Sequence, residues 1–202
     1  MTHTLRYTTF SLLALALLGG GWYFFRSQGR TSGGNAPLPY SPAASQTGGG
    51  GDSSQATSVA EAAVAPLVNL YRNVAYGFSF KYPDGLKVGG APSPDGSATT
   101  ILVQDIAAHI GFQIYITPFA DPDTTITAAR VARDLPALAM RGAEIAQVGA
   151  SSPGLAFLAE DPSFGESRQI WFVYKKHLYQ VSAKSSQDAL LQRVLATWEF
   201  GR

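Results

Sequence analysis

The hydrophobic and polar positions divide the chain into three segments with different patterns. Residues 1–26 are mostly apolar, residues 27–58 are rich in Gly, Ser and Pro, and residues 59–202 carry the alternating and helical patterns of a folded domain. Lipid, water and a protein core favour different side chains, so each pattern indicates a different environment. The order predicts an N-terminal membrane anchor, a disordered linker and one globular domain, the head.

The apolar run from Tyr7 to Phe25 is nineteen residues long and contains no charge. A helix of that length extends roughly 28 Å, which is close to the hydrocarbon thickness of a bilayer. We therefore expect an uncleaved transmembrane helix that is in contact with membrane lipid. The alternative is a secretory signal cleaved at Ala14 and Ala16 or at residues 19–21, although each cut would leave an apolar new terminus in water.

The charges beside the anchor do not decide its orientation, because Arg6 and the terminal amine precede it and Arg26 and Arg30 follow it. A short N-terminal flank before a long tethered domain is the layout of a signal anchor. We expect a single-pass plasma (inner) membrane protein with the head outside the cytoplasm. A head that faces the cytoplasm is the alternative.

The tract of residues 27–58 has too few apolar side chains to offset the entropy of ordering it, so it is predicted to be disordered. A flexible coil of that length has a root-mean-square reach of roughly 30 Å. The head would therefore sample a shallow zone above the membrane.

Periodicity within the head predicts both strands and helices. Strands are expected over residues 78–82, 100–105, 112–117, 145–148, 155–160, 168–174 and 178–183. Helices are expected over residues 59–65, from a cap at Thr127 to about residue 134, and after Ser185, which has capping spacing to Asp188. Runs of strands with helices between and after them favour an α+β fold, an αβα sandwich with a mainly antiparallel sheet, over a doubly wound parallel sheet.

Charge and composition exclude several functional classes. Twelve of the fifteen Lys and Arg and thirteen of the fourteen Asp and Glu lie in residues 59–202, so the head carries a net charge of −1. Nucleic-acid binding relies on a concentrated basic footprint, which this balance does not provide. The absence of Cys excludes disulfides, thiolate metal sites and cysteine nucleophiles, and we expect no cofactor.

Two short motifs in the head resemble those of a known family. The segment Tyr76–Pro83 resembles the opening strand of PsbP-like domains, and the segment Leu195–Phe200 is similar to their ending, a helix followed by aromatic residues. That family is an αβα-sandwich group that includes photosystem II extrinsic subunits and bacterial membrane-attached relatives. The resemblance spans about residues 71–200 and implies an accessory or binding role. It transfers no functional residue, because the matching positions are core aromatics and a turn.

One departure from the family lies between the last two predicted strands, which should form a hairpin. Lys175 and Lys176 occupy its turn, where related sequences often have an Asp-Gly pair. Lysine suits a two-residue type I′ turn poorly, because that turn needs positive φ. We therefore expect a loop of more than two residues with a basic tip completed by His177.

The candidate surface for a ligand or partner combines this basic tip with the nearby aromatic residues of the last two strands. Rings on a face that no helix covers would suit a peptide, glycan or small ligand. If helices cover both faces, these rings belong to the core instead. The candidate residues are Trp171, Tyr174, Lys175, Lys176, His177 and Tyr179.

Two functions are therefore weighed. The leading hypothesis is a membrane-anchored extracytoplasmic binding or assembly module without catalytic activity, whose partner is an envelope protein or small ligand. The alternative is an envelope hydrolase that uses two pairs of carboxylates, although such side chains also cap turns. No G-x-S-x-G nucleophile motif occurs in the sequence. The carboxylates of the alternative are Asp121, Asp123, Glu160 and Asp161.

Overall fold

The computed structural model describes residues 52–150, 152–161 and 165–201. The predicted anchor and residues 27–51 of the predicted linker lie outside the described residues. Within the described part of the chain, no helix is both long enough and apolar enough to cross a bilayer.

Ten strands and three α-helices make up the described residues, together with one short 3-10 helix. The strands are β1 (Asn69–Asn73), β2 (Phe78–Tyr82), β3 (Lys87–Pro92), β4 (Thr99–Asp105), β5 (Ile110–Pro118), β6 (Arg141–Val148), β7 (Ser152–Asp161), β8 (Gly165–Tyr174), β9 (His177–Lys184) and β10 (Glu199–Phe200). The helices are α2 (Asp52–Val64), α3 (Ala128–Asp134), η1 (Ser185–Gln187) and α4 (Asp188–Ala196).

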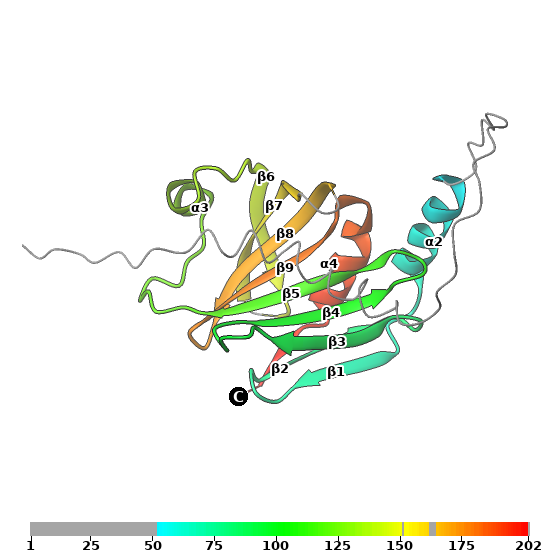
Figure 1. Cartoon of the computed structure of the whole chain (residues 1–202), viewed down its shortest axis with the longest axis horizontal. Coiled ribbons are helices and arrows are strands. Elements are labelled where there is room, and N and C mark those ends of the chain that lie inside the picture. The colour runs from blue at the N-terminus through cyan, green and yellow to red at the C-terminus, as the bar shows by residue number, and fades with distance from the viewer. Residues whose placement is uncertain (1–51, 151, 162–164, 202) are drawn as a thin grey trace, which may run out of the picture.

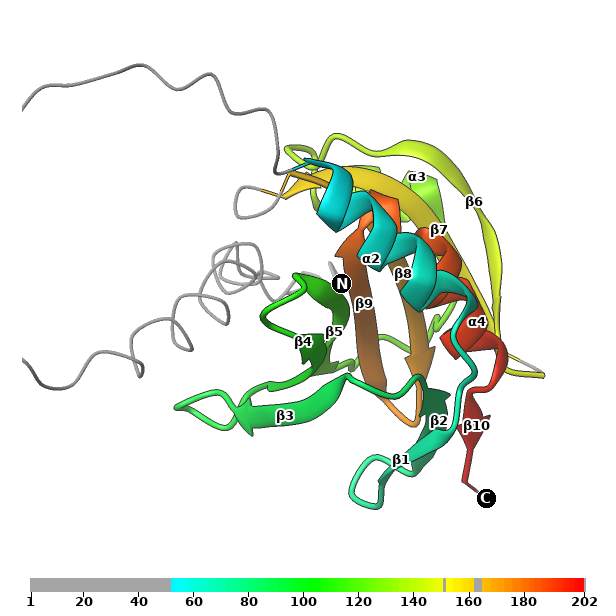
Figure 2. The same cartoon turned by 90° about the vertical axis from the view of Figure 1, so that its right-hand side faces the viewer.

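The strands form two sheets in which every recorded pairing is antiparallel. A seven-stranded sheet has the order β3-β4-β5-β9-β8-β7-β6 (Figure 1), and a three-stranded sheet has the order β1-β2-β10 (Figure 2). The expected α+β class with a mainly antiparallel sheet is therefore confirmed. Hairpins join the strands β3-β4-β5 and the strands β6-β7-β8-β9, because short turns pair strands that follow one another in sequence. The pairing of β5 with β9 joins these two groups across the intervening segment.

The helices lie on opposite faces of the seven-stranded sheet. In Figure 2, α2 and α4 lie in front of β8 and β9, whereas α3 lies behind β7. The small sheet packs on the same side as α4, because β2 residues share the main core with α4 residues. A second, smaller core that contains Val131 of α3 lies on the opposite face.

Aromatic rings join the two sheets within the main core. Trp198 follows α4, and its ring stacks on Phe78 and Phe80 of β2 at centroid distances of 4.7 and 5.1 Å. Phe172 and Tyr179 stack at 4.9 Å on the large sheet, and the Phe172 ring meets Trp198 edge-on. Each buried ring removes a large apolar area from water, so these contacts contribute strongly to the stability of the head.

The structure confirms seven predicted strands and the helix capped by Thr127, whose side chain accepts a hydrogen bond from the Arg130 backbone N–H. Three further strands, β1, β3 and β10, were not predicted. Helix α2 begins at Asp52 instead of residue 59, so its first residues come from the segment assigned to the linker.

The predicted cap of the last helix is wrong. Ser185 begins the 3-10 helix η1, and the N-cap of α4 is Gln187, which makes no side-chain capping hydrogen bond. The Gln187 amide instead accepts a hydrogen bond from the Gly111 N–H at 2.7 Å and donates one to the His109 carbonyl at 2.9 Å. The side chain of Gln187 therefore ties the start of α4 to the β4–β5 turn, a role that local spacing does not reveal.

Candidate binding surface

The β8–β9 turn has two residues, so the expectation of a longer loop is wrong. Tyr174 pairs with His177, and the intervening Lys175 and Lys176 have φ values of 45° and 59°. Both lysines thus adopt the left-handed conformation that a two-residue hairpin favours and that a Cβ atom penalises. We call residues Tyr174, Lys175, Lys176 and His177 the hairpin tip.

Contacts with the C-terminal end of the chain hold Lys175 in place. Its ammonium donates a hydrogen bond to the Gly201 carbonyl at 3.0 Å and lies 5.2 Å from the centre of the Tyr174 ring. The Tyr174 hydroxyl donates to the same carbonyl at 2.6 Å, and the Gly201 N–H donates to the Gly77 carbonyl at 2.7 Å. The hairpin tip, the β1–β2 turn and the C-terminal end therefore form one connected corner of the head.

Lys176 and His177 complete the tip. The Lys176 carbonyl accepts a hydrogen bond from the Phe119 N–H at 2.8 Å, and its side chain is exposed. The His177 ring packs edge-on against Tyr76 at 5.1 Å, and its Nδ1 lies 2.9 Å from the Lys175 carbonyl oxygen. The backbone of the tip is thus fixed on both sides, while the Lys176 ammonium projects into solvent.

Two of the predicted surface residues belong to the core instead. Trp171 and Tyr179 are 7% and 0% exposed, and they pack into different hydrophobic clusters on opposite faces of the sheet. Burial raises the pKa of the Tyr179 phenol, and the phenols of Tyr76 and Tyr174 add to that effect. The two rings therefore do not form one surface with the hairpin tip.

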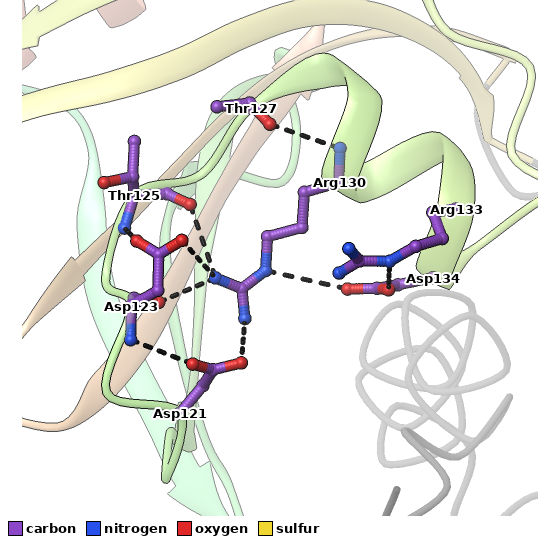
Figure 3. Close-up of polar contacts among 7 residues, drawn as sticks. All are labelled: Asp121, Asp123, Thr125, Thr127, Arg130, Arg133 and Asp134. Carbon is purple, nitrogen blue, oxygen red and sulfur yellow. Dashed lines mark hydrogen bonds and ion pairs between the residues drawn. The ribbon is translucent and has the colours of Figure 1, made fainter.

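The first carboxylate pair of the hydrolase hypothesis is part of a cluster around one arginine (Figure 3). The Arg130 guanidinium contacts Asp121 Oδ2 at 2.8 Å and Asp134 Oδ2 at 3.6 Å, and it donates to the Asp123 carbonyl at 2.6 Å. It also lies 5.1 Å from the centre of the Phe119 ring. We call Arg130 with these three aspartates the arginine clamp. It fastens the loop before α3 to the helix itself.

Within the clamp, the two aspartates also cap turns. Asp121 accepts from the Asp123 N–H, and Asp123 accepts from the Thr125 N–H, each at 2.9 Å. The backbone and side-chain hydrogen bonds from Thr125, with a smaller effect of Arg130, lower the pKa of Asp123. A general acid needs the opposite shift, so this arrangement suits a structural role.

The second carboxylate pair is divided by the sheet. Glu160 and Asp161 are successive residues of β7, so their side chains point to opposite faces. The Glu160 side chain is 69% exposed beside Arg141, whereas Asp161 is buried. Two carboxylates that flank one substrate bond must converge on it, and this pair does not.

A shallow cleft lies at the end of the large sheet, where the β4–β5 turn meets β9. Polar side chains line it, among them Gln104, Gln113 and Ser182. The Ser182 hydroxyl is buried and has no hydrogen-bond partner in the described part of the chain. The sequence pattern did not reveal these residues, because alternating Gln and Ser in a strand are typical of solvent-facing positions.

The described residues contain no group of three His, Cys, Asp or Glu side chains that could hold a metal ion. The hairpin tip remains the candidate surface that combines predicted residues with an unusual backbone.

Comparison with solved structures finds distant similarities to this chain. No protein-family model matches the sequence. No functionally curated protein matches it either. The solution structure of cyanobacterial PsbP from Synechocystis sp. PCC 6803 is similar over 68% of this chain and 95% of its own length, with 13% identity and a TM-score of 0.48.

Proposed function

We propose that the chain is a membrane-anchored extracytoplasmic binding or assembly module, and that the hairpin tip contacts an acidic surface of an envelope protein. The apolar run from Tyr7 to Phe25 supports the anchor, and the linker supports a tethered head. We also propose that the head has the αβα-sandwich architecture of PsbP-like domains, because its two short sequence motifs resemble motifs of that family.

The proposal rests mainly on the left-handed backbone conformation of Lys175 and Lys176. Left-handed conformations of residues with a Cβ cost free energy, and they persist where the surrounding structure enforces them and often where function uses them. Here, the Gly201 carbonyl and the Phe119 N–H enforce the conformation. The result is a cation on a preorganised turn, which reduces the entropy cost of binding.

Photo-crosslinking of the full chain in its native membrane tests this function. A photoreactive residue replaces Ala120, which is exposed and follows Phe119, so the tip itself stays intact. We expect a discrete adduct with an envelope protein. Charge reversal by Lys176→Glu should abolish the adduct, because the acidic partner would then be repelled.

The matched control carries the photoreactive residue in place of Ile145, which is 85% exposed on β6 and lies away from the tip. It should give no such adduct. Equal adducts at both positions, no adduct at position 120, or an adduct that survives Lys176→Glu would each contradict the proposal.

A further inference from the structure

Exposed aliphatic side chains lie on β1 and just beyond its two ends. Val68, Leu70 and Val74 are 64%, 56% and 84% exposed, while Tyr71 on the other face packs against the main core. This is the alternation of a strand that buries one face and presents the other. Leu70 and Arg72 lie on the outward side within β1, with Val68 and Val74 just beyond its ends. We call these four residues the β1 stripe.

The β1 stripe is unusual for its position. Six large hydrophobic residues are strongly exposed in the described part of the chain, and three of them belong to the stripe; a fourth, Val64, ends α2 just before it. β1 is also an edge strand of the small sheet. Soluble proteins usually shield an edge strand from contact with other molecules. An edge strand that exposes several aliphatic side chains therefore indicates that another surface covers it.

Two cations accompany the stripe. Arg72 lies within it, and Lys81 pairs across the strands with Leu70. Among the described residues, neither side chain makes a hydrogen bond or an ion pair, and both residues are exposed. Glu199 shares a cross-strand row with Arg72 through Ser79, but it lies two strands away on β10. Thus two unpaired cationic side chains lie beside the exposed aliphatic side chains of the β1 stripe, although the net charge of the whole head is close to zero.

We propose that the β1 stripe rests on the surface of the bilayer that holds the anchor, with its aliphatic side chains in the headgroup region and Arg72 and Lys81 on anionic lipid. This inference rests on the anchor and orientation of the proposed function. Aliphatic side chains beside cations are the combination that binds membrane interfaces, where each cation adds to attraction by anionic headgroups.

The chain outside the structure makes lipid the favoured occupant. Residues 27–51 separate the predicted anchor from α2, and a flexible coil of that length reaches roughly 25–30 Å. In both views β1 lies at the opposite end of the head from the start of α2 (Figures 1 and 2). If β1 rests on the bilayer, the linker therefore has to extend from the bilayer along the head to α2. A tether of this reach keeps the bilayer at a high effective concentration, so even a weak contact is populated.

The experiment uses the full chain, which has no Cys, so a single introduced thiol can be labelled. Leu70→Cys is labelled with an environment-sensitive fluorophore and reconstituted in vesicles of phosphatidylglycerol and phosphatidylcholine. We expect a blue-shifted emission that is quenched by nitroxide-bearing lipid. Arg72→Glu in the same protein, or vesicles of phosphatidylcholine alone, should reduce the quenching. The control Ile145→Cys should show neither the shift nor the quenching.

Each other result overturns the inference. A blue shift at position 70 without quenching by the lipid would show that a protein strand or a second copy covers the stripe. Emission typical of water would show that nothing covers it. Flotation of the same vesicles separates this failure from failure of the anchor: protein that floats with an unquenched Leu70→Cys label retains the proposed attachment, whereas protein that does not float contradicts both.

Discussion

At the scale of single residues, the hairpin tip shows how tertiary contacts override local preference. Lysine disfavours positive φ, yet Lys175 and Lys176 both adopt it. The flanking strands twist in the sense that a two-residue turn of this type matches, and the Gly201 carbonyl binds the Lys175 ammonium. The local cost is therefore offset by the pairing of two long strands.

Replacement of Lys176 tests this strain. Lys176→Gly should stabilise the head by about 1 kcal/mol, because glycine adopts positive φ without a Cβ penalty. Urea denaturation measures the change in the free energy of unfolding. Lys175→Gly should give a smaller gain, since it also removes the hydrogen bond to Gly201. Destabilisation by Lys176→Gly would show that the turn is not strained.

Asp95 provides a pH-dependent prediction at the same scale. The Ser93 hydroxyl, with the N–H and hydroxyl of Ser97, lowers the pKa of Asp95 from 3.8 to about 2. The folded-state pKa is below the unfolded one, so the ionised group stabilises the β3–β4 turn above about pH 4 and loses this effect as pH falls toward 2.

An NMR titration of the Asp95 carboxyl should give a midpoint near 2 in the folded head. Ser93→Ala should move the midpoint up toward 3.8, because it removes the largest cause of the shift. A midpoint of 3.8 before any substitution would contradict the hydrogen-bonded turn.

At the scale of elements, a close backbone contact joins the β6–β7 turn to the end of α4. Gly149, between β6 and β7, has a φ of 58°, and a Cβ there would lie 2.1 Å from the Trp198 carbonyl oxygen. Its N–H donates to the Leu195 carbonyl at 2.9 Å. Only glycine allows this turn to contact the end of α4 so closely.

Gly149→Ala should therefore destabilise the head more than Gly142→Ala. Gly142 has the same φ of 58°, but a Cβ at that position would have no neighbouring atom within 4 Å, so its substitution should cost about 1–2 kcal/mol of unfolding free energy from the backbone alone. Overpacking should add about 1–3 kcal/mol at position 149. Thermal denaturation of the two variants compares these costs, and equal losses would contradict the close contact with Trp198.

Helix α2 depends on one side chain of α4. The Arg193 guanidinium donates to the Ala63 carbonyl and, at 2.7 Å, to the Ala65 carbonyl, which are at the C-terminal end of α2. Arg193→Met keeps the apolar stem but removes both hydrogen bonds. We expect the opening free energy of α2 to fall by about 1–2 kcal/mol.

Hydrogen exchange of the α2 amides measures this loss, while the amides of β8 and β9 should keep their protection. Arg133→Met on α3, where the side chain is 70% exposed, serves as the control and should leave α2 unchanged. Unchanged exchange in Arg193→Met would show that packing of Val59 and Ala62 alone holds the helix.

The sequence predicts a helix or strand correctly where the local residue pattern is typical of only one of the two. Residues 78–82 alternate strictly, and Thr127 is followed by the spacing of a capped helix, so both were correctly predicted. Strand β3 (Lys87–Pro92) contains two glycines and a proline, which are typical of turns, and only its pairing with β4 makes it a strand. Local pattern did not predict the burial of Trp171 and Tyr179, because that burial depends on which faces of the sheet the helices cover.

At the scale of the whole molecule, the proposed function depends on the proposed attachment of the head to the membrane. The hairpin tip and β1 both lie toward the end of the head that is opposite the start of α2 (Figures 1 and 2). If the β1 stripe rests on lipid, the basic tip lies close to the membrane surface, where it would meet the acidic surface of a membrane protein. Membrane attachment is therefore the claim on which both proposals depend.

Labelling of a single thiol in intact cells tests that claim most directly. Full-length Ile145→Cys, which has its only thiol on an exposed part of the head, is treated with a membrane-impermeant maleimide before and after lysis, and membranes are then extracted with alkaline carbonate. The account predicts equal labelling before and after lysis, with the labelled protein retained in the membrane pellet. Labelling that requires lysis, or labelled protein released by carbonate, would contradict it.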